Sequence, residues 1–239
     1  MLDFLGIGAQ KAGTTWLCER LSTHPQIRFP GGKEMHFWNH VGDPGRSRGL
    51  KWYRGVFAAN PPGVRQGEIT PAYAILPPAT IAEIRRNYPE LRLLYVIRNP
   101  IERAWSAALM WLDKMEMRIE EASDAWFLDQ FRSQASLRRG DYARCLQAWA
   151  AEFPAERILV IRYEELAAAP RDTLLGVCAH LEVDAGPFAA ADPTELGARV
   201  FAGTGHALPE RLREELRRLY AEPIERLREL LGDDLAAWR

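Results

Sequence analysis

Three apolar runs stand out along the chain, and they cover residues 2–8, 91–98 and 157–163. All three are rich in Leu, Ile and Val without alternating polar positions, which predicts strands buried on both faces of a parallel sheet. A stretch with helical periodicity follows each run, at residues 14–21, 100–112 and 170–181. The repeated order of strand and helix predicts an α/β fold with right-handed crossovers.

Weaker patterns fill the rest of the chain. Residues 64–70 predict a further strand, which leads into a helix at residues 78–88. The segment 122–153 predicts two helices separated by residues 138–141. The C-terminal part shows two helical stripes of Leu and Ile, and Pro223 interrupts them.

Residues 29–63 are rich in Gly, Pro and aromatic side chains and show no clean period. Long ordered segments in α/β proteins often carry substrate contacts, so we expect this insertion to contribute to an acceptor site. No internal repeat, low-complexity tract or linker divides the chain. The sequence therefore predicts one domain over residues 1–239, with a mostly parallel central β-sheet flanked by helices.

Composition and charge are those of an ordinary globular protein. The 239 residues are 47% hydrophobic and 26% charged, and 31 Lys and Arg against 32 Asp and Glu give a formal net charge of -1. Because nucleic-acid binders usually carry a strong basic excess, this balance argues against a nucleic-acid partner. A local basic pocket remains compatible with it.

The cysteines and the apolar runs exclude several further classes. Cys18, Cys145 and Cys178 are scattered without metal-ligand spacing, which favours buried thiols in a reducing compartment. The N-terminus has no basic region before its short apolar run, and no stretch reaches the ~18 apolar residues that span a bilayer. We therefore expect a soluble cytoplasmic protein without a membrane span.

A glycine loop between the first strand and the first helix is the most informative motif. Gly8 and Gly13 occupy the two glycine positions of the P-loop pattern G-x-x-x-x-G-K-[ST], and Thr15 occupies its last position. Thr14 stands where the lysine of that pattern belongs, and Lys11 lies three residues earlier. The loop therefore predicts a P-loop-like phosphate cradle that does not read the γ-phosphate of ATP or GTP.

A second phosphate element follows the strand at residues 91–98. A charged Arg98 at the carboxyl end of a buried strand is costly without a partner. Ser106 lies eight residues later, where the following helix can return it to the same point. A guanidinium and a hydroxyl suit a phosphate monoester, although an ion pair between Arg98 and a carboxylate is the simpler alternative.

These motifs resemble a known family. The sequence Lys-Ala-Gly-Thr-Thr-Trp at residues 11–16 resembles the 5′-phosphosulfate loop of sulfotransferases that use 3′-phosphoadenosine 5′-phosphosulfate (PAPS), and residues 96–106 resemble their 3′-phosphate segment. Residues 140–166 and 203–223 resemble the heparan sulfotransferase branch. This likeness implies that a loop at 199–209 closes over the cofactor. It implies cofactor contacts from Lys11, Ala12, Gly13, Thr14, Thr15, Trp16, Arg98, Ser106, Tyr163, Gly203, Thr204 and Gly205.

Trp16 and Tyr163 are candidates for stacking on the adenine, because a flat apolar ring face suits a purine. Both are equally plausible as aromatic residues of the core. In the second interpretation, they would contribute to packing and not to the recognition of the base.

Catalysis by such an enzyme needs a general base for the acceptor and a cation for the leaving phosphate. Lys11 is our candidate for the cation, and no metal is expected. The sequence Lys-Glu-Met-His-Phe-Trp at residues 33–38 resembles the Glu-x-His-Phe-Phe stretch of glucosaminyl 3-O-sulfotransferases, which implies that Glu34 is the base and His36 assists it. Two alternatives are His36 acting alone, as in the cytosolic branch, and a purely structural role for both residues.

The acceptor is less well defined than the cofactor. We expect substrate contacts from Lys33, Trp38 and Glu68. Ile69 stands where the sugar-sulfating relatives carry a lysine, which argues against a heparan-like acceptor unless Lys33 substitutes for that lysine. The near-neutral net charge likewise favours a small-molecule or carbohydrate acceptor over a long polyanion.

The sequence as a whole predicts a PAPS-dependent sulfotransferase that transfers a sulfuryl group to a hydroxyl, and less readily to an amine. One alternative is a P-loop small-molecule kinase, which Thr14 at the lysine position disfavours. The other is a non-catalytic nucleotide-binding protein. The presence of Lys11, Glu34 and Arg98 counts against that alternative.

Overall fold

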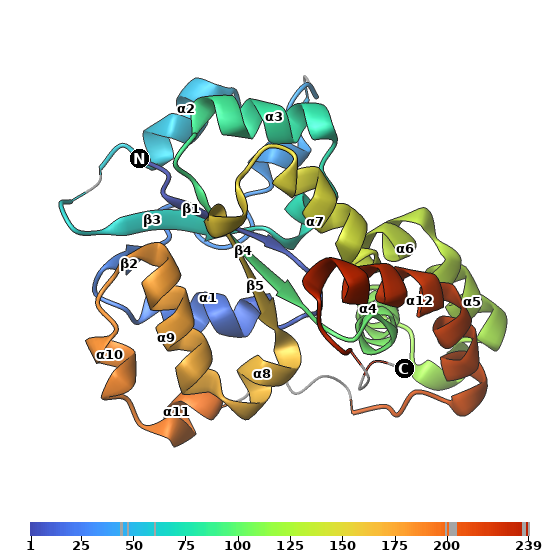
Figure 1. Ribbon diagram of the computed structural model, residues 1–239. Helices are drawn as coiled ribbons and strands as arrows, with labels where there is room; N and C mark the ends of the chain where they lie inside the picture. The colour runs from blue at the N-terminus through green and yellow to red at the C-terminus, as the bar shows by residue number, and fades with distance from the viewer. Residues whose placement is uncertain are drawn as a thin grey trace.

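A five-stranded, all-parallel sheet forms the centre of the molecule (Figure 1). The computed structural model describes residues 1–43, 45–46, 48–59, 61–198, 200, 205–235 and 238. The strand order is β2-β3-β1-β4-β5, so the first strand lies in the middle. The strands are β1 (Phe4–Gly8), β2 (Ile27–Arg28), β3 (Arg65–Ile69), β4 (Arg92–Ile97) and β5 (Ile158–Arg162).

Helices cover both faces of this sheet. In Figure 1, α1 and α9 lie below the sheet with α8, α10 and α11, whereas α2, α3 and α7 lie above it. A third group, α4 to α6 with α12, gathers to one side, and α12 packs against α4, α5 and α7. The bounds are α1 (Thr14–Ser22), α2 (Leu50–Val56), α3 (Pro78–Asn87), α4 (Pro100–Lys114), α5 (Asp124–Arg132), α6 (Gln134–Gly140), α7 (Tyr142–Ala150), α8 (Tyr163–Ala168), α9 (Pro170–Leu181), α10 (Gly186–Ala189), α11 (Pro193–Gly197) and α12 (Glu210–Leu231). Four short 3-10 helices complete the described elements: η1 (Phe37–Asn39), η2 (Pro71–Ile75), η3 (Ile119–Glu121) and η4 (Ala155–Arg157).

The register between β1 and β3 is fixed by glycines that face large side chains. Gly6 pairs with Ile69, and a Cβ added at Gly6 would come within 2.6 Å of the Ile69 side chain. Phe4 pairs with Gly67 in the same way, and its ring occupies the space where a Gly67 side chain would lie. A shifted register would bring side chains into collision, so the ends of these two strands have a fixed offset.

The predicted α/β class and the predicted strands are confirmed, while two helical predictions are wrong in detail. Residues 124–150 form three helices, because Ser133 caps a separate α6 by accepting the backbone N–H of Ser136, and Asp141 caps α7 by accepting that of Arg144. Pro223 does not interrupt the last helix, since α12 continues through it. Proline lacks the backbone N–H that would complete one helical hydrogen bond. Losing that bond costs less free energy than exposing the apolar side chains that α12 buries on both sides of Pro223.

Two general predictions concern the cysteines and the membrane. All three cysteines are buried and free. Among the described residues, no helix combines the length and the apolar character needed to cross a membrane.

Candidate active site

The loop between β1 and α1 presents unpaired backbone donors. Gly13 is the N-cap of α1 and adopts a φ of 93°, a left-handed conformation that favours glycine. No acceptor is found in the described part of the chain for the N–H groups of Gly13, Thr14 and Thr15. Free N–H groups at a helix N-terminus attract anions, so this loop is a candidate phosphate cradle.

Two cationic residues, Lys11 and Arg98, contact each other beside this cradle. The guanidinium of Arg98, which follows β4, donates to the carbonyl oxygen of Lys11 at 3.3 Å. Burial lowers the pKa of Lys11, and the charge of Arg98 lowers it further. Neither side chain forms an ion pair with a carboxylate among the described residues, so the simpler alternative for Arg98 is wrong. Adjacent cations without a paired carboxylate suit an anionic ligand such as a phosphate.

The ring of Tyr163 supports this arrangement. Its centre lies 4.7 Å from the guanidinium carbon of Arg98, and its edge covers Gly13, where an added Cβ would approach it to 3.0 Å. One face of the ring is therefore occupied by Arg98. The proposed stacking of Tyr163 on adenine stays a prediction.

Trp16 is only 8% exposed, and its indole N–H donates to the carbonyl oxygen of Leu196 at 3.0 Å. This contact joins α1 to α11. The structure thus places Trp16 in the core, and its predicted contact with the cofactor stays a prediction.

One residue of the predicted 3′-phosphate element and one of the predicted closing segment, Ser106 and His206, lie in α4 or against it. Ser106 is half-buried in this helix. The neighbouring indole of Trp105 donates to the carbonyl oxygen of His206 at 2.9 Å, which attaches the segment after Gly205 to α4. Gly203 and Thr204, which were expected to contact the cofactor, lie outside the described residues.

The loop with the predicted base is attached to the end of β3. The backbone N–H groups of Glu34, Met35 and His36 donate to three successive residues of that end: the Ile69 carbonyl at 3.1 Å, the Glu68 carboxylate at 3.2 Å and the Thr70 hydroxyl at 3.5 Å. Glu34 and His36 have φ angles of 64° and 56°. Such left-handed conformations cost about 1–3 kcal/mol each, so the surrounding contacts must hold them.

Around Glu34, the side chains form a chain of polar contacts. One carboxylate oxygen pairs with the ammonium of Lys33, and the other lies 3.5 Å from Nε2 of His36. Nδ1 of His36 lies 3.1 Å from Oδ1 of Asn39. The structure thus brings the predicted base and its predicted assistant together, with Glu34 partly exposed.

Two predicted acceptor contacts need correction. Glu68 is fully buried and Trp38 is 2% exposed, so neither presents a surface to an acceptor. Trp38 belongs to an aromatic cluster with Phe37 and Tyr53, in which Phe37 stacks on Tyr53 at 4.2 Å. Sequence reasoning missed Tyr53 because only the folded chain brings this tyrosine from α2 to the end of β3.

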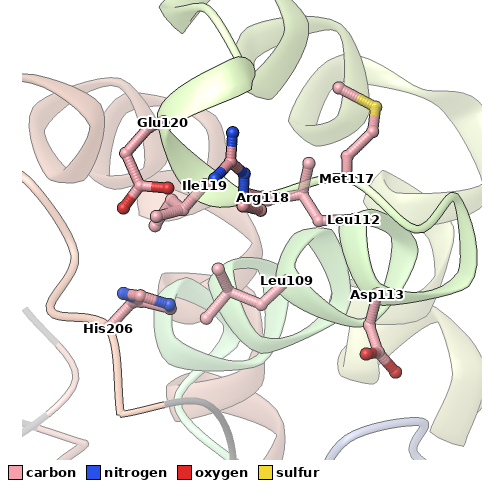
Figure 2. Close-up of a pocket in the computed structure, with 8 residues that line it drawn as sticks. All are labelled: Leu109, Leu112, Asp113, Met117, Arg118, Ile119, Glu120 and His206. Atoms are coloured by element: carbon pink, nitrogen blue, oxygen red, sulfur yellow. The ribbon is translucent and has the colours of Figure 1, made fainter.

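A small pocket adjoins α4 (Figure 2). Its volume is about 200 Å³, and Leu109 and Leu112 of α4 face Ile119 across it, with His206 at one end. The carboxylate of Asp113 lines this pocket and also raises the pKa of Lys11, which counters part of the lowering by burial.

A comparison with known protein families identifies the family of this chain. A model of the sulfotransferase domain matches residues 2–195. The chain belongs to the sulfotransferase domain family. The predicted family and enzyme class are thereby confirmed.

Individual sulfotransferases extend this finding. Heparan sulfate glucosamine 3-O-sulfotransferase 6 of Mus musculus is 31% identical over 175 residues, which are 69% of this chain and 47% of that protein. The chain spans about half the length of the curated relatives it matches. The crystal structure of a sulfotransferase from Alicyclobacillus acidocaldarius matches with a TM-score of 0.78 at 27% identity, covering 100% of this chain and 99% of that one. Mouse sulfotransferase SULT7A1, crystallised with PAP, shares the fold with a TM-score of 0.59 at 17% identity, covering 93% and 84% of the two chains.

Proposed function

We propose that this sulfotransferase transfers a sulfuryl group from PAPS to an acceptor hydroxyl, with Glu34 as the general base. The pair of cations formed by Lys11 and Arg98 is the observation that carries this proposal. They lie at the carboxyl ends of the adjacent strands β1 and β4, where parallel sheets bind ligands. The likeness to a mouse sulfotransferase crystallised with PAP supports the choice of nucleotide.

The residues present fit a nucleotide with separate 3′- and 5′-phosphate groups. The free N–H groups of Gly13 to Thr15 and the ammonium of Lys11 would hold the 5′ side. Arg98 and Ser106 would hold the 3′-phosphate, because a guanidinium fork and a hydroxyl together match its oxygens. When bound, PAPS supplies the sulfuryl group and a phosphate leaving group.

The chain's own groups have distinct roles in the reaction. The Glu34 carboxylate takes the proton from the acceptor oxygen, and His36 orients that carboxylate from 3.5 Å away. Lys11 offsets the negative charge that develops on the leaving phosphate. Lys33 shares the Glu34 carboxylate in this structure, so an incoming acceptor has to compete with it or bind beside it.

We propose a small or neutral acceptor, either a carbohydrate or another hydroxyl compound. Ile69 is fully buried against Gly6 at the position where the sugar-sulfating relatives are expected to carry a lysine. In the described chain, Lys33 is the only cation that pairs with Glu34, apart from His36 when protonated. A long polyanionic acceptor would need more positive charge than this. The insertion at 29–63 would contribute acceptor contacts, and the segment at 199–209 would close over the cofactor.

Two measurements test this function. Adenosine 3′,5′-bisphosphate (PAP) should raise the melting temperature far more than ATP with magnesium does, because two separated phosphate sites distinguish them. An acceptor screen with isotopically labelled PAPS, read by mass spectrometry, should show the transfer of one sulfuryl group. Equal thermal shifts by PAP and ATP would contradict the cofactor assignment, and transfer by a Glu34→Gln variant at the wild-type rate would contradict the base assignment.

A further inference from the structure

Glu68 is a buried carboxylate that none of the proposed chemical steps uses. It lies in β3, next to the last residue of the strand, and is fully buried. No lysine or arginine pairs with it among the described residues. Burial of a carboxylate without a cationic partner is costly, so its presence here needs an explanation beyond packing.

Four donors from different segments converge on this carboxylate. Oε1 accepts the hydroxyls of Tyr53 at 2.6 Å and Tyr73 at 3.0 Å. Oε2 accepts the hydroxyl of Thr70 at 2.6 Å and the backbone N–H of Met35 at 3.2 Å. An ionised carboxylate offers about four lone-pair sites, so the ionised form satisfies all four donors.

The donor at Met35 is the one with functional consequences. Met35 stands between Glu34 and His36, the two left-handed residues of the base loop. A tether at the central residue therefore acts on both flanking conformations at once. Since Thr70 also accepts the N–H of His36, the Oε2 side of Glu68 supports the loop directly and through Thr70.

The same tether links the base loop to the phosphate cradle. The N–H of Thr70 donates to the carbonyl oxygen of Gly6 at 2.9 Å, and Gly6 lies in the strand that leads into the loop of Lys11. The interlocked register of Gly6 and Ile69 prevents sliding at this point. The placement of Glu34 relative to Lys11 thus depends on contacts made by residues 68–70.

We propose that Glu68 is a positioning residue, whose carboxylate holds the Glu34–His36 loop in the conformation that aims Glu34 at the acceptor. This inference rests on the proposed function, because it assumes that Glu34 is the base. Glu68 itself does not contact an acceptor, since its buried oxygens are already occupied by protein donors.

A Glu68→Gln variant tests the inference, with Tyr53→Phe as its matched control. The glutamine keeps the size of the side chain but replaces one accepting oxygen with an NH2 donor, so the N–H of Met35 and the three hydroxyls share one accepting oxygen instead of two. Tyr53→Phe removes a donor to Oε1 and leaves the Oε2 tether in place. Loss of general packing would affect both variants, whereas loss of the tether would affect Glu68→Gln alone.

For Glu68→Gln we expect kcat to fall about 100-fold, the scale of a misplaced catalytic group, with the Kd for PAP unchanged within about twofold. Hydrogen exchange at the amides of Glu34, Met35 and His36 should become faster, while exchange in residues 9–16 stays the same. Tyr53→Phe should keep kcat within about threefold of the wild type. A Glu68→Gln enzyme with wild-type kcat, or with unchanged exchange at Met35, would overturn the inference.

Two further variants separate the possible failures. If Glu68→Gln does not fold, Thr70→Val removes a donor to Oε2 and the acceptor for His36, and should show faster exchange at the His36 amide with a smaller loss of kcat. Unchanged exchange in that variant would count against the inference. Glu34→Gln with wild-type transfer would refute the base assignment, and the exchange data on Glu68→Gln would still decide whether the tether exists.

Discussion

The guanidinium of Arg98 lies over the ring of Tyr163 at 4.7 Å, and the edge of the same ring covers Gly13. One aromatic side chain from α8 thus contacts both phosphate elements that the sequence predicts, although the two are separated by more than eighty positions. The 3.3 Å hydrogen bond from Arg98 to the Lys11 carbonyl adds a direct link between them. The cradle and the arginine therefore act as one unit, which gives two predictions for ligand binding.

Arg98→Ala should weaken the binding of PAP about 10- to 100-fold, because a hydrogen bond to a charged group contributes about 1.5–3 kcal/mol. The rate of the chemical step at saturating PAPS should change much less than the affinity for PAP. Arg162→Ala is the control, since Arg162 ends the neighbouring strand β5 but pairs with Glu165 and Asp233. Isothermal titration with PAP measures both variants, and equal losses would contradict a specific phosphate role for Arg98.

Gly13→Ala should reduce PAP affinity by disturbing the contact between the loop and Tyr163. The new Cβ would come within 3.0 Å of the ring, at a φ of 93° that alanine rarely adopts. Gly232→Ala introduces a similar left-handed strain at a φ of 64°, with no atom within 4 Å of the new Cβ. Both variants should lose about 1–2 kcal/mol of stability. Only Gly13→Ala should bind PAP more weakly, and intact affinity in that variant would argue that the ring moves aside without consequence.

The phosphate elements could be predicted from the sequence because each is local. A glycine loop between a strand and a helix has few possible geometries, so Gly13 and Lys11 are recognisable from spacing alone. Arg98 is recognisable because a charge at the end of an apolar run needs a partner. In the structure these three residues lie together, as the spacing predicts.

The surroundings of the base could not be predicted in the same way. The prediction that Glu68 contacts the acceptor rests on its place beside Ile69, where the sugar-sulfating relatives are expected to carry a lysine. The burial of Glu68 depends on Tyr53 and Tyr73, which the fold brings from α2 and η2, and single-sequence patterns do not encode such long-range pairings. The same limit explains why Trp38 was wrongly expected to contact the acceptor, because its burial depends on the position of α2.

Two alanine substitutions should change stability in opposite directions. A Cβ at Gly140 would collide with the ring of Tyr220, which is buried and hydrogen-bonded to Ser136, so Gly140→Ala should cost about 1–3 kcal/mol. Gly176 lies exposed within α9 with no atom within 4 Å of an added Cβ, so Gly176→Ala should stabilise the protein by about 0.5–1 kcal/mol. Urea midpoints at constant m measure both changes. Destabilisation by Gly176→Ala would show that this helix position is constrained by something other than local propensity.

The alkaline limit of kcat/KM for PAPS should report the protonation of Lys11. Burial and the charge of Arg98 lower the pKa of Lys11 from 10.5, so the cation needed for the phosphate is lost at a lower pH than for an ordinary lysine. Activity should therefore fall, as pH rises, on a limb that begins below pH 10.5, because kcat/KM follows the free enzyme.

Three variants identify the group behind that limb. Asp113→Asn removes a carboxylate that raises the pKa of Lys11, so it should move the limb to lower pH. Lys114→Met removes a cation that lowers this pKa and should move the limb to higher pH. Lys11→Arg should abolish the limb, because arginine keeps its charge throughout the accessible range. A limb that stays at the same pH in all three variants would show that another group titrates, and the role of Lys11 as the cation at the leaving phosphate would then have to be abandoned.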